Sequence, residues 1–121
     1  MKKILFIEDE SALQDAVTTV LKEEGYDVRS ALDGETGLEA AKREKPDLIL
    51  LDLILPRMDG FAVLEALKKE EATREVPVMI LSNLEGGADI ERALGLGATT
   101  YLVKTNYRLE EVVEKIKEVL G

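Results

Sequence analysis

The stretch PDLILLDLILPRMDG, residues 46–60, decides how the rest of the chain is interpreted. Within it, residues 48–51 form an unbroken apolar run, which is typical of a strand buried on both faces of a parallel sheet. The run ends on a carboxylate, Asp52, and three further apolar residues follow before Pro56. An acid between two apolar segments is either a solvated turn residue or a group with a charged partner. The remaining sequence must decide between these two interpretations.

Composition describes an ordinary soluble globular domain and excludes several kinds of chemistry. The 121 residues are 45% hydrophobic and 34% charged, and the size suits a single core. The formal charge is −9, and without a run of basic residues this argues against direct binding of nucleic acid. The chain has no cysteine, so disulfides and thiolate sites are excluded. It has no histidine either, which removes the usual general base and the commonest metal ligand.

Hydropathy indicates neither a membrane span nor a secretory signal. No apolar stretch approaches the roughly 18 residues that a spanning helix needs. The apolar run near the N-terminus, residues 4–7, is too short for the hydrophobic region of a signal peptide. We therefore expect a cytoplasmic protein that does not contact a membrane.

Short apolar runs alternate with helical patterns, which predicts βα units on a parallel sheet. We expect strands at residues 3–7, 27–31, 48–51, 78–81 and 99–103, the second at an edge because it is less apolar. The spacing predicts helices between them and a last helix from about Arg108, which has the cleanest apolar stripe. Ser11 and Asp59 are the expected caps of the first and third helices, and Gly25 the expected end of the first.

Five such units predict an α/β fold with a doubly wound, flavodoxin-like (βα)5 arrangement. The chain is too short for a (β/α)8 barrel, and the expected strand order is 2-1-3-4-5 in three α/β/α layers. No linker or low-complexity tract interrupts the pattern, so we expect one domain over residues 1–121. In such sheets the functional site lies beyond the C-terminal ends of the strands, around the point between strands 1 and 3.

Polar residues stand just past the C-terminal ends of four strands, and they are Glu8, Asp9, Asp52, Ser82 and Lys104. Because strands 1 and 3 are expected to be neighbours, the three carboxylates should cluster. Two such charges a few ångströms apart repel each other by roughly 4 kcal/mol at an effective dielectric constant of 20. A divalent cation relieves this repulsion, and an all-oxygen ligand set without His or Cys suits Mg²⁺. Lys104 would add a positive charge, and Ser82 a neutral hydroxyl.

Each of these residues taken alone also has a structural explanation. Acids at positions 8–10 could complement the dipole of the first helix. Asp52 could be a loop acid, Ser82 a turn hydroxyl and Lys104 a surface lysine. Their joint occurrence at the ends of four separate strands favours a functional site.

These residues also carry a family resemblance that covers the whole chain. The chain closely resembles the receiver domain of two-component response regulators, of the chemotaxis-type single-domain kind. No single motif is diagnostic, but their order and spacing together are specific. The motifs are FIED at residues 6–9, DLILPRMDG at 52–60, VMILS at 78–82, GLGA at 95–98 and YLVK at 101–104.

The resemblance implies that Asp52 accepts a phosphoryl group from a phosphohistidine, assisted by Mg²⁺. Because this chain has no histidine, the donor must be another protein, a sensor histidine kinase or a phosphotransfer protein. By the family pattern, Asp9, Asp52 and the backbone carbonyl of Ile54 hold the metal directly, and Glu8 acts nearby, through water. Such a domain catalyses only its own phosphorylation and dephosphorylation.

The resemblance also implies a switch and an output surface. Lys104 would neutralise the transferred group, Ser82 would hydrogen-bond it, and Tyr101 would turn inward as Ser82 moves. The usual output face comprises the fourth helix, the fifth strand and the fifth helix, and it would bind a downstream protein. The domain would be a monomer or a dimer linked to phosphorylation, either stand-alone or part of a longer chain.

The sequence departs from the family pattern at three positions. Glu8 stands where Asp is commoner, which alters the metal shell, and Ser82 stands where Thr is frequent, which keeps the hydroxyl. Thr105 follows Lys104 where the family usually has Pro, often after a cis peptide bond. Because a cis bond before a residue other than Pro costs about 2.5–4 kcal/mol, we expect a trans bond there.

There are three alternatives, two of them from other classes of protein. A flavodoxin-like cofactor binder needs a phosphate-binding loop after the first strand, but that loop reads EDES, which repels phosphate. An aspartate-nucleophile phosphatase needs a second acid two residues after Asp52, where this chain has Ile54. A degenerate receiver that acts as a phosphorylation-independent scaffold is the third alternative, and the intact set of acids, Ser82 and Lys104 argues against it.

Overall fold

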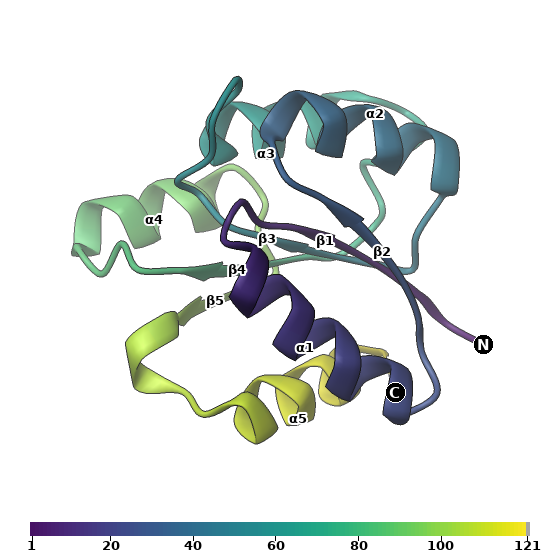
Figure 1. Cartoon of the computed structure of the whole chain (residues 1–121). Helices are drawn as coiled ribbons and strands as arrows, with labels where there is room; N and C mark the ends of the chain where they lie inside the picture. The colour runs from purple at the N-terminus through teal and green to yellow at the C-terminus, as the bar shows by residue number, and fades with distance from the viewer. Residues whose placement is uncertain (121) are drawn as a thin grey trace.

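Strands and helices alternate along the chain in the computed structural model, which describes residues 1–120 (Figure 1). The strands are β1 (Lys3–Ile7), β2 (Asp27–Ala31), β3 (Leu48–Leu51), β4 (Val78–Ser82) and β5 (Thr100–Val103). The α-helices are α1 (Ser11–Glu23), α2 (Gly34–Glu44), α3 (Gly60–Lys69), α4 (Gly87–Gly95) and α5 (Leu109–Leu120). A 3-10 turn, η1 (Lys104–Asn106), joins β5 to α5.

The five strands form one parallel sheet in the order β2-β1-β3-β4-β5, which confirms the predicted order and the edge position of β2. Figure 1 shows α1 and α5 on one face of the sheet and α2, α3 and α4 on the other. Each face therefore has its own hydrophobic core, one built with Val17 and Ile116, the other with Leu64 and Ala93. This is the predicted flavodoxin-like arrangement of three layers.

The apolar run of β3 contributes to both cores at once. All four of its side chains are fully buried, with Leu48 and Leu50 in the core beneath α1 and α5, and Ile49 and Leu51 in the opposite one. Burying each side chain of this size contributes roughly 1.5–3 kcal/mol. The strand is therefore held on both faces, and so is the chain at Asp52, which follows it directly.

The predicted capping residue is confirmed for α3 but not for α1. The Asp59 carboxylate accepts a hydrogen bond from the Ala62 N–H at 3.1 Å, which confirms the predicted cap. The predicted cap at Ser11 is wrong, because the helix begins at Ser11 and Glu10 is the capping position, without a side-chain hydrogen bond. The Glu8 carboxylate accepts a hydrogen bond from the Glu10 N–H at 3.1 Å, Glu10 is extended, and the helix starts one residue earlier than predicted.

Other boundaries lie within a residue of the prediction. β5 begins at Thr100 and α5 at Leu109, each one residue late, a difference within the fraying of element ends. Gly25 has φ of 95° and follows the Glu24 cap, as predicted for the end of the first helix. No cis peptide bond occurs in residues 1–120, so the predicted trans bond before Thr105 is confirmed.

The loop after β3 folds back against the start of α3. The Gly60 N–H donates to the Leu53 carbonyl at 2.9 Å, and a Cβ atom at Gly60 would overlap backbone atoms of Asp52 and Leu53. Glycine is therefore required for this close approach. Among the described helices, none is long and apolar enough to cross a membrane.

Candidate functional site

Three carboxylates meet where β1 and β3 end. The two strands pair in parallel with Ile7 opposite Leu51, so the residues that follow them lie side by side. One carboxylate oxygen from each of Glu8, Asp9 and Asp52 lies within 4.8 Å of the others, which confirms the predicted cluster. Glu8 and Asp52 are buried, with 0% and 3% of their surface exposed, whereas Asp9 faces the solvent.

The cluster lines an acidic pocket of about 160 Å³ at this edge of the sheet. Its other lining residues come from the loops after β1, β3 and β4 and from the end of β5, and they are Glu10, Ile54, Asn83 and Lys104. The pocket is open to solvent, and Asp9 is one of the exposed residues of its lining. Oxygen ligands from three carboxylates with no nitrogen or sulfur donor suit a hard divalent cation. The residues present therefore fit a metal ion.

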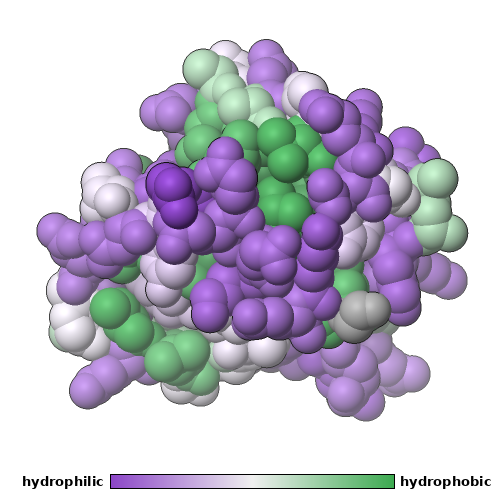
Figure 2. All heavy atoms as spheres, turned by 90° about the horizontal axis from the view of Figure 1, so that it is seen from below, coloured by the Kyte–Doolittle hydropathy of each residue, from purple (hydrophilic) through white to green (hydrophobic). Residues whose placement is uncertain are grey.

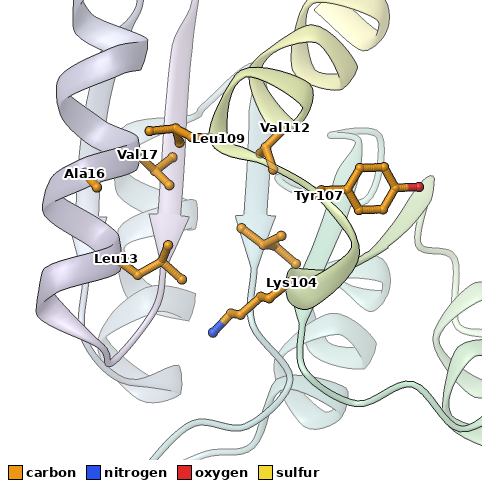
Figure 3. Close-up of a pocket in the computed structure, with 8 residues that line it drawn as sticks. Leu13, Ala16, Val17, Lys104, Tyr107, Leu109 and Val112 are labelled. Atoms are coloured by element: carbon orange, nitrogen blue, oxygen red, sulfur yellow. The ribbon is translucent and has the colours of Figure 1, made fainter.

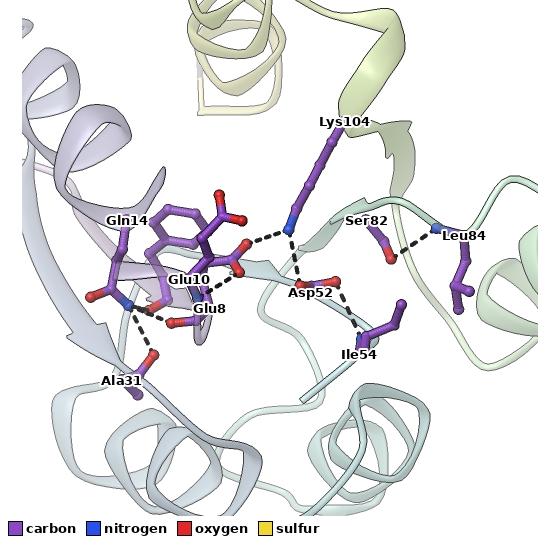
Figure 4. A network of polar contacts seen from close by, with 10 residues as sticks. Glu8, Glu10, Gln14, Ala31, Asp52, Ile54, Ser82, Leu84 and Lys104 are labelled. Atoms are coloured by element: carbon purple, nitrogen blue, oxygen red, sulfur yellow. Dashed lines mark hydrogen bonds and ion pairs between the residues drawn. The ribbon is translucent and has the colours of Figure 1, made fainter. Parts of the chain in front are cut away.

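Lys104, the first residue of η1 after β5, reaches both buried acids (Figure 4). Its ammonium nitrogen lies 2.8 Å from Glu8 Oε1 and forms an ion pair with it. The same nitrogen donates a hydrogen bond to Asp52 Oδ2 at 3.0 Å. One positive charge therefore faces three negative ones. The remaining negative charge is what a cation in the pocket would neutralise.

Burial and charge shift the pKa values of this ion pair. Burial raises the pKa of the Glu8 carboxyl above its ordinary value, against the lowering effect of Lys104 and of the Glu10 N–H. Burial alone would lower the pKa of Lys104, but the carboxylates of Glu8 and Asp52 outweigh it and raise that pKa. Lys104 therefore stays positively charged. A divalent cation in the pocket would favour the ionised form of Glu8.

Ser82 and Tyr101 meet the same loop residue, Leu84. Ser82 is fully buried at the end of β4, and its hydroxyl accepts a hydrogen bond from the Leu84 N–H at 3.3 Å. The Tyr101 hydroxyl donates to the Leu84 carbonyl at 2.6 Å. The Tyr101 ring is already half-buried in this structure, and burial raises the pKa of its hydroxyl. The loop after β4 thus joins the buried serine to the tyrosine.

Ile54 lies at the mouth of the acidic pocket. Its N–H donates a hydrogen bond to Asp52 Oδ1 at 3.2 Å, so the loop after β3 curls around the carboxylate. The Ile54 side chain is 55% exposed, unusual for an isoleucine, because the backbone rather than the side chain turns toward the acid. Asp52 therefore accepts one hydrogen bond on each oxygen, from Lys104 and from Ile54.

Sequence reasoning missed three residues around the site. Asn83 and Glu10 line the pocket, and their positions next to Ser82 and Asp9 were the available signal. Gln14 is 7% exposed, and its amide reaches the carbonyl of Glu8 (Figure 4). The signal for Gln14 was its spacing from Val17 and Leu21, which puts a polar side chain on the apolar face of α1.

A second hollow of about 160 Å³ lies between α1 and α5, and its lining is mostly aliphatic (Figure 3). The stem of Lys104 lines it, beside Leu13 of α1 and Val112 of α5, while the ammonium is directed to the acids. Figure 2 shows the surface on this side as mainly hydrophilic, with hydrophobic side chains exposed between the charged ones. The acidic pocket, not this hollow, has the groups for chemistry.

Comparison with known proteins identifies a family. The model of the response regulator receiver domain matches residues 4–117. The chain is 41% identical over 119 residues to a probable transcriptional regulator, ycf27, of Porphyridium aerugineum, covering 98% of this chain and 48% of that protein. It is 39% identical over 120 residues to the DNA-binding dual master transcriptional regulator RpaA of Synechocystis, covering 99% and 49%. The chain thus spans about half the length of these relatives.

Solved structures that resemble this chain point to the same family. The chemotaxis response regulator CheY4 of Vibrio cholerae superimposes with a TM-score of 0.91 at 27% identity, with 98% of both chains covered. The receiver domain of a sensor histidine kinase from Pseudomonas aeruginosa, solved with a magnesium ion in its active-site cleft, gives a TM-score of 0.89 at 29% identity, covering 99% and 98%. The chain therefore belongs to the response regulator receiver domains, which take part in phosphorylation-based two-component signalling.

Proposed function

We propose that residues 1–121 are one receiver domain that accepts a phosphoryl group on Asp52 with the help of Mg²⁺. The observation that carries this proposal is the environment of Asp52. Its carboxylate follows a fully buried strand, accepts a hydrogen bond from Lys104, and shares a pocket with Glu8 and Asp9. An exposed loop acid would have none of these features. Gly121, at the end of this domain, lies outside the described residues.

Asp52 acts as the nucleophile in this reaction. A carboxylate oxygen of Asp52 bonds to phosphorus while the bond between phosphorus and the donor's histidine nitrogen breaks, and that nitrogen leaves with the electron pair. The donor is a sensor histidine kinase or a phosphotransfer protein, because this chain has no histidine of its own. Lys104 neutralises charge on the transferred group, and the Ser82 hydroxyl donates a hydrogen bond to it.

Asp9, Asp52 and the Ile54 carbonyl would hold Mg²⁺ directly, with Glu8 close by. When bound, the ion supplies positive charge to the phosphoryl oxygens. Glu8 differs from Asp9 because it is fully buried and paired with Lys104, whereas Asp9 faces the solvent. We therefore assign Glu8 the role of orienting Lys104 and the water around the ion.

The output of this reaction is a change in the surface formed by α4, β5 and α5. Ser82 and Tyr101 share Leu84 as a hydrogen-bond partner, so a movement of Ser82 toward a phosphoryl group would be passed to Tyr101. The surface would then bind a downstream protein or a second copy of the chain, by a shift between two existing states. Because this segment carries a charge of −9, we do not expect it to contact DNA itself.

The domain catalyses only its own phosphorylation and dephosphorylation under this proposal, and works in the cytoplasm as its resemblance to receiver domains implies. No observation on residues 1–120 favours the alternative of a phosphorylation-independent scaffold. The acids, Ser82 and Lys104 are all in place, and a scaffold needs none of them.

Incubation with a small acyl phosphate tests the proposal. With Mg²⁺, the wild-type protein should gain the mass of one phosphoryl group, and chelation of the metal should prevent the gain. Asp52→Asn keeps the shape of the side chain but removes the nucleophile, so the gain should disappear. Asp33→Asn is the matched control, because Asp33 is also an acid at a strand-to-helix loop but lies outside the pocket.

Two results would contradict the proposal. Phosphorylation that persists in Asp52→Asn would place the acceptor elsewhere. A wild-type protein that is never phosphorylated, at any Mg²⁺ concentration and with any phosphohistidine donor, would leave the scaffold as the better description.

A further inference from the structure

The buried polar side chains of residues 1–120 are few, and one of them has no role in the reaction proposed above. Five are buried: Glu8, Gln14, Asp52, Thr73 and Ser82. Glu8, Asp52 and Ser82 belong to the site. The Thr73 hydroxyl donates to the Leu67 carbonyl at 2.7 Å, beyond the C-terminal end of α3. Gln14, in the first turn of α1, remains to be explained.

The side-chain amide of Gln14 points at three backbone carbonyl groups (Figure 4). Its nitrogen lies 2.9 Å from the Ala31 carbonyl at the end of β2, and 3.1 Å from the Glu8 carbonyl in the loop after β1. A longer contact of 3.4 Å reaches the Phe6 carbonyl within β1. One amide thus connects α1 to the C-terminal ends of two neighbouring strands.

The loop that this amide touches is the one that holds two of the acids. Among the hydrogen bonds of residues 1–120, the Glu8 carbonyl has no donor other than Gln14. The Gln14 backbone N–H also donates to the Glu10 carbonyl at 3.0 Å, at the other end of the loop. Between these two bonds lies Asp9. Gln14 therefore forms hydrogen bonds to the loop on both sides of the exposed Asp9.

We propose that Gln14 is a positioning residue for the divalent cation, acting through the backbone of Glu8 and Asp9. This inference rests on the proposed function, because it assumes that these acids bind the ion. Without the amide, the buried carbonyl of Glu8 has no donor, and the carbonyl oxygens of Phe6 and Ala31 lie close by. The peptide between Glu8 and Asp9 would rotate to find a partner. Both carboxylates would turn with it, out of the arrangement that the ion needs.

Gln14→Met tests this directly, because methionine has nearly the same length and no N–H group. We expect Mg²⁺ affinity, measured by titration calorimetry on metal-free protein, to fall about 10-fold or more, the range typical of residues that orient metal ligands. In the absence of metal, hydrogen exchange at the amides of residues 8–10 should become faster. This second measurement does not depend on the ion or on phosphorylation.

Thr73→Val is the matched control. It also deletes a buried donor and leaves a carbonyl without its partner, but on the opposite side of the sheet from α1 and away from the acidic pocket. Its stability should fall, measured by chemical denaturation, while its Mg²⁺ affinity and its exchange at residues 8–10 stay at the wild-type values. A loss of affinity that merely follows from lower stability would appear in both variants.

The outcomes separate this inference from the function on which it rests. If the wild-type protein binds Mg²⁺ and Gln14→Met binds it equally well, or if Thr73→Val loses as much affinity, the role of Gln14 is overturned but the function stands. If the wild-type protein does not bind Mg²⁺, the metal site itself is wrong, and this inference fails with it. Should Gln14→Met not fold, Gln14→Asn replaces it, since its amide is one methylene short of the carbonyls, and wild-type affinity there would equally overturn the proposal.

Discussion

The strand that presents Asp52 and the region around α4 and β5 are held in the fold very differently. All four residues of β3 are fully buried, whereas the first two residues of β5, Thr100 and Tyr101, are half-exposed. In α4 only Ala93 is buried, and Leu94 beside it is 46% exposed. Asp52, the proposed phosphoacceptor, therefore follows a fully buried strand. The surface that would report its phosphorylation belongs to a loosely packed part.

The α4 region is also less firmly held at the start of its helix. Asp33 and Asp59 cap α2 and α3 with side-chain hydrogen bonds, whereas Gly86 at the start of α4 offers none. Two specific contacts hold the α4 region instead. The guanidinium of Arg92 lies 4.1 Å from the centre of the Phe61 ring, and the Tyr101 hydroxyl donates to the Leu84 carbonyl. An element held by a few contacts can move at small cost.

The largest expected effect is the loss of stability caused by a substitution in the buried strand β3. Leu50→Ala should lower the free energy of unfolding by about 2–5 kcal/mol, because it opens a cavity at a fully buried position. The matched change in the other region, Leu94→Ala, should alter it by about 0.5 kcal/mol or less, because that side chain is largely exposed. Urea denaturation of both variants measures the two values. Equal losses would show that α4 is packed as tightly as β3.

A pair of glycine substitutions should give smaller effects of opposite sign. Gly60→Ala should destabilise the protein by about 1–3 kcal/mol, because its Cβ would overlap the backbone of Asp52 and Leu53. Gly95→Ala, at the end of α4, should stabilise it by about 0.4–1 kcal/mol, because no atom lies within 4 Å of the new Cβ. Thermal denaturation measures both. A stabilising Gly60→Ala would mean that the loop after β3 adapts easily, against the comparison made above.

The smallest expected effect concerns the charged cap of α2, which α4 lacks. The Thr36 N–H lowers the pKa of the Asp33 carboxyl below its ordinary value of 3.8. A lowered pKa in the folded state means that ionised Asp33 contributes stability above pH 3.8, and that this contribution is lost as the pH falls through the folded-state value. The difference in stability between wild type and Asp33→Asn should thus shrink on acidification below pH 3.8. A difference that does not change with pH would contradict this.

Much of the fold could be predicted from the sequence, because its signals are local. The apolar run at residues 48–51 contains no polar residue, which favours a strand buried on both faces, as observed. The alternation of such runs with helical stripes sets the parallel sheet, and the strand order follows from the fold class. The same rule brought Glu8, Asp9 and Asp52 together, since it places the ends of β1 and β3 side by side.

Predictions from the sequence failed where a side chain forms a hydrogen bond that the local pattern does not reveal. Ser11 is a good capping residue by type, but the Glu8 carboxylate holds the Glu10 N–H and moves the helix start. Gln14 was missed, although its amide donates hydrogen bonds to the Glu8 carbonyl after β1 and the Ala31 carbonyl of β2. In both places a side chain forms a hydrogen bond with a backbone group, and hydrophobic periodicity in the sequence does not predict such bonds.

The sequence by itself determined which residues form the strands, which of them end in acids, and that a cation or a lysine must balance those acids. Only the tertiary structure decided how the balance is made. Lys104 pairs with Glu8 as well as with Asp52. The Ile54 N–H donates to the Asp52 carboxylate, and the Gln14 amide donates to the Glu8 carbonyl in the loop after β1. The physical reason is that burial patterns repeat along the chain and can be read locally. A hydrogen bond instead depends on ångström distances between residues far apart in the sequence.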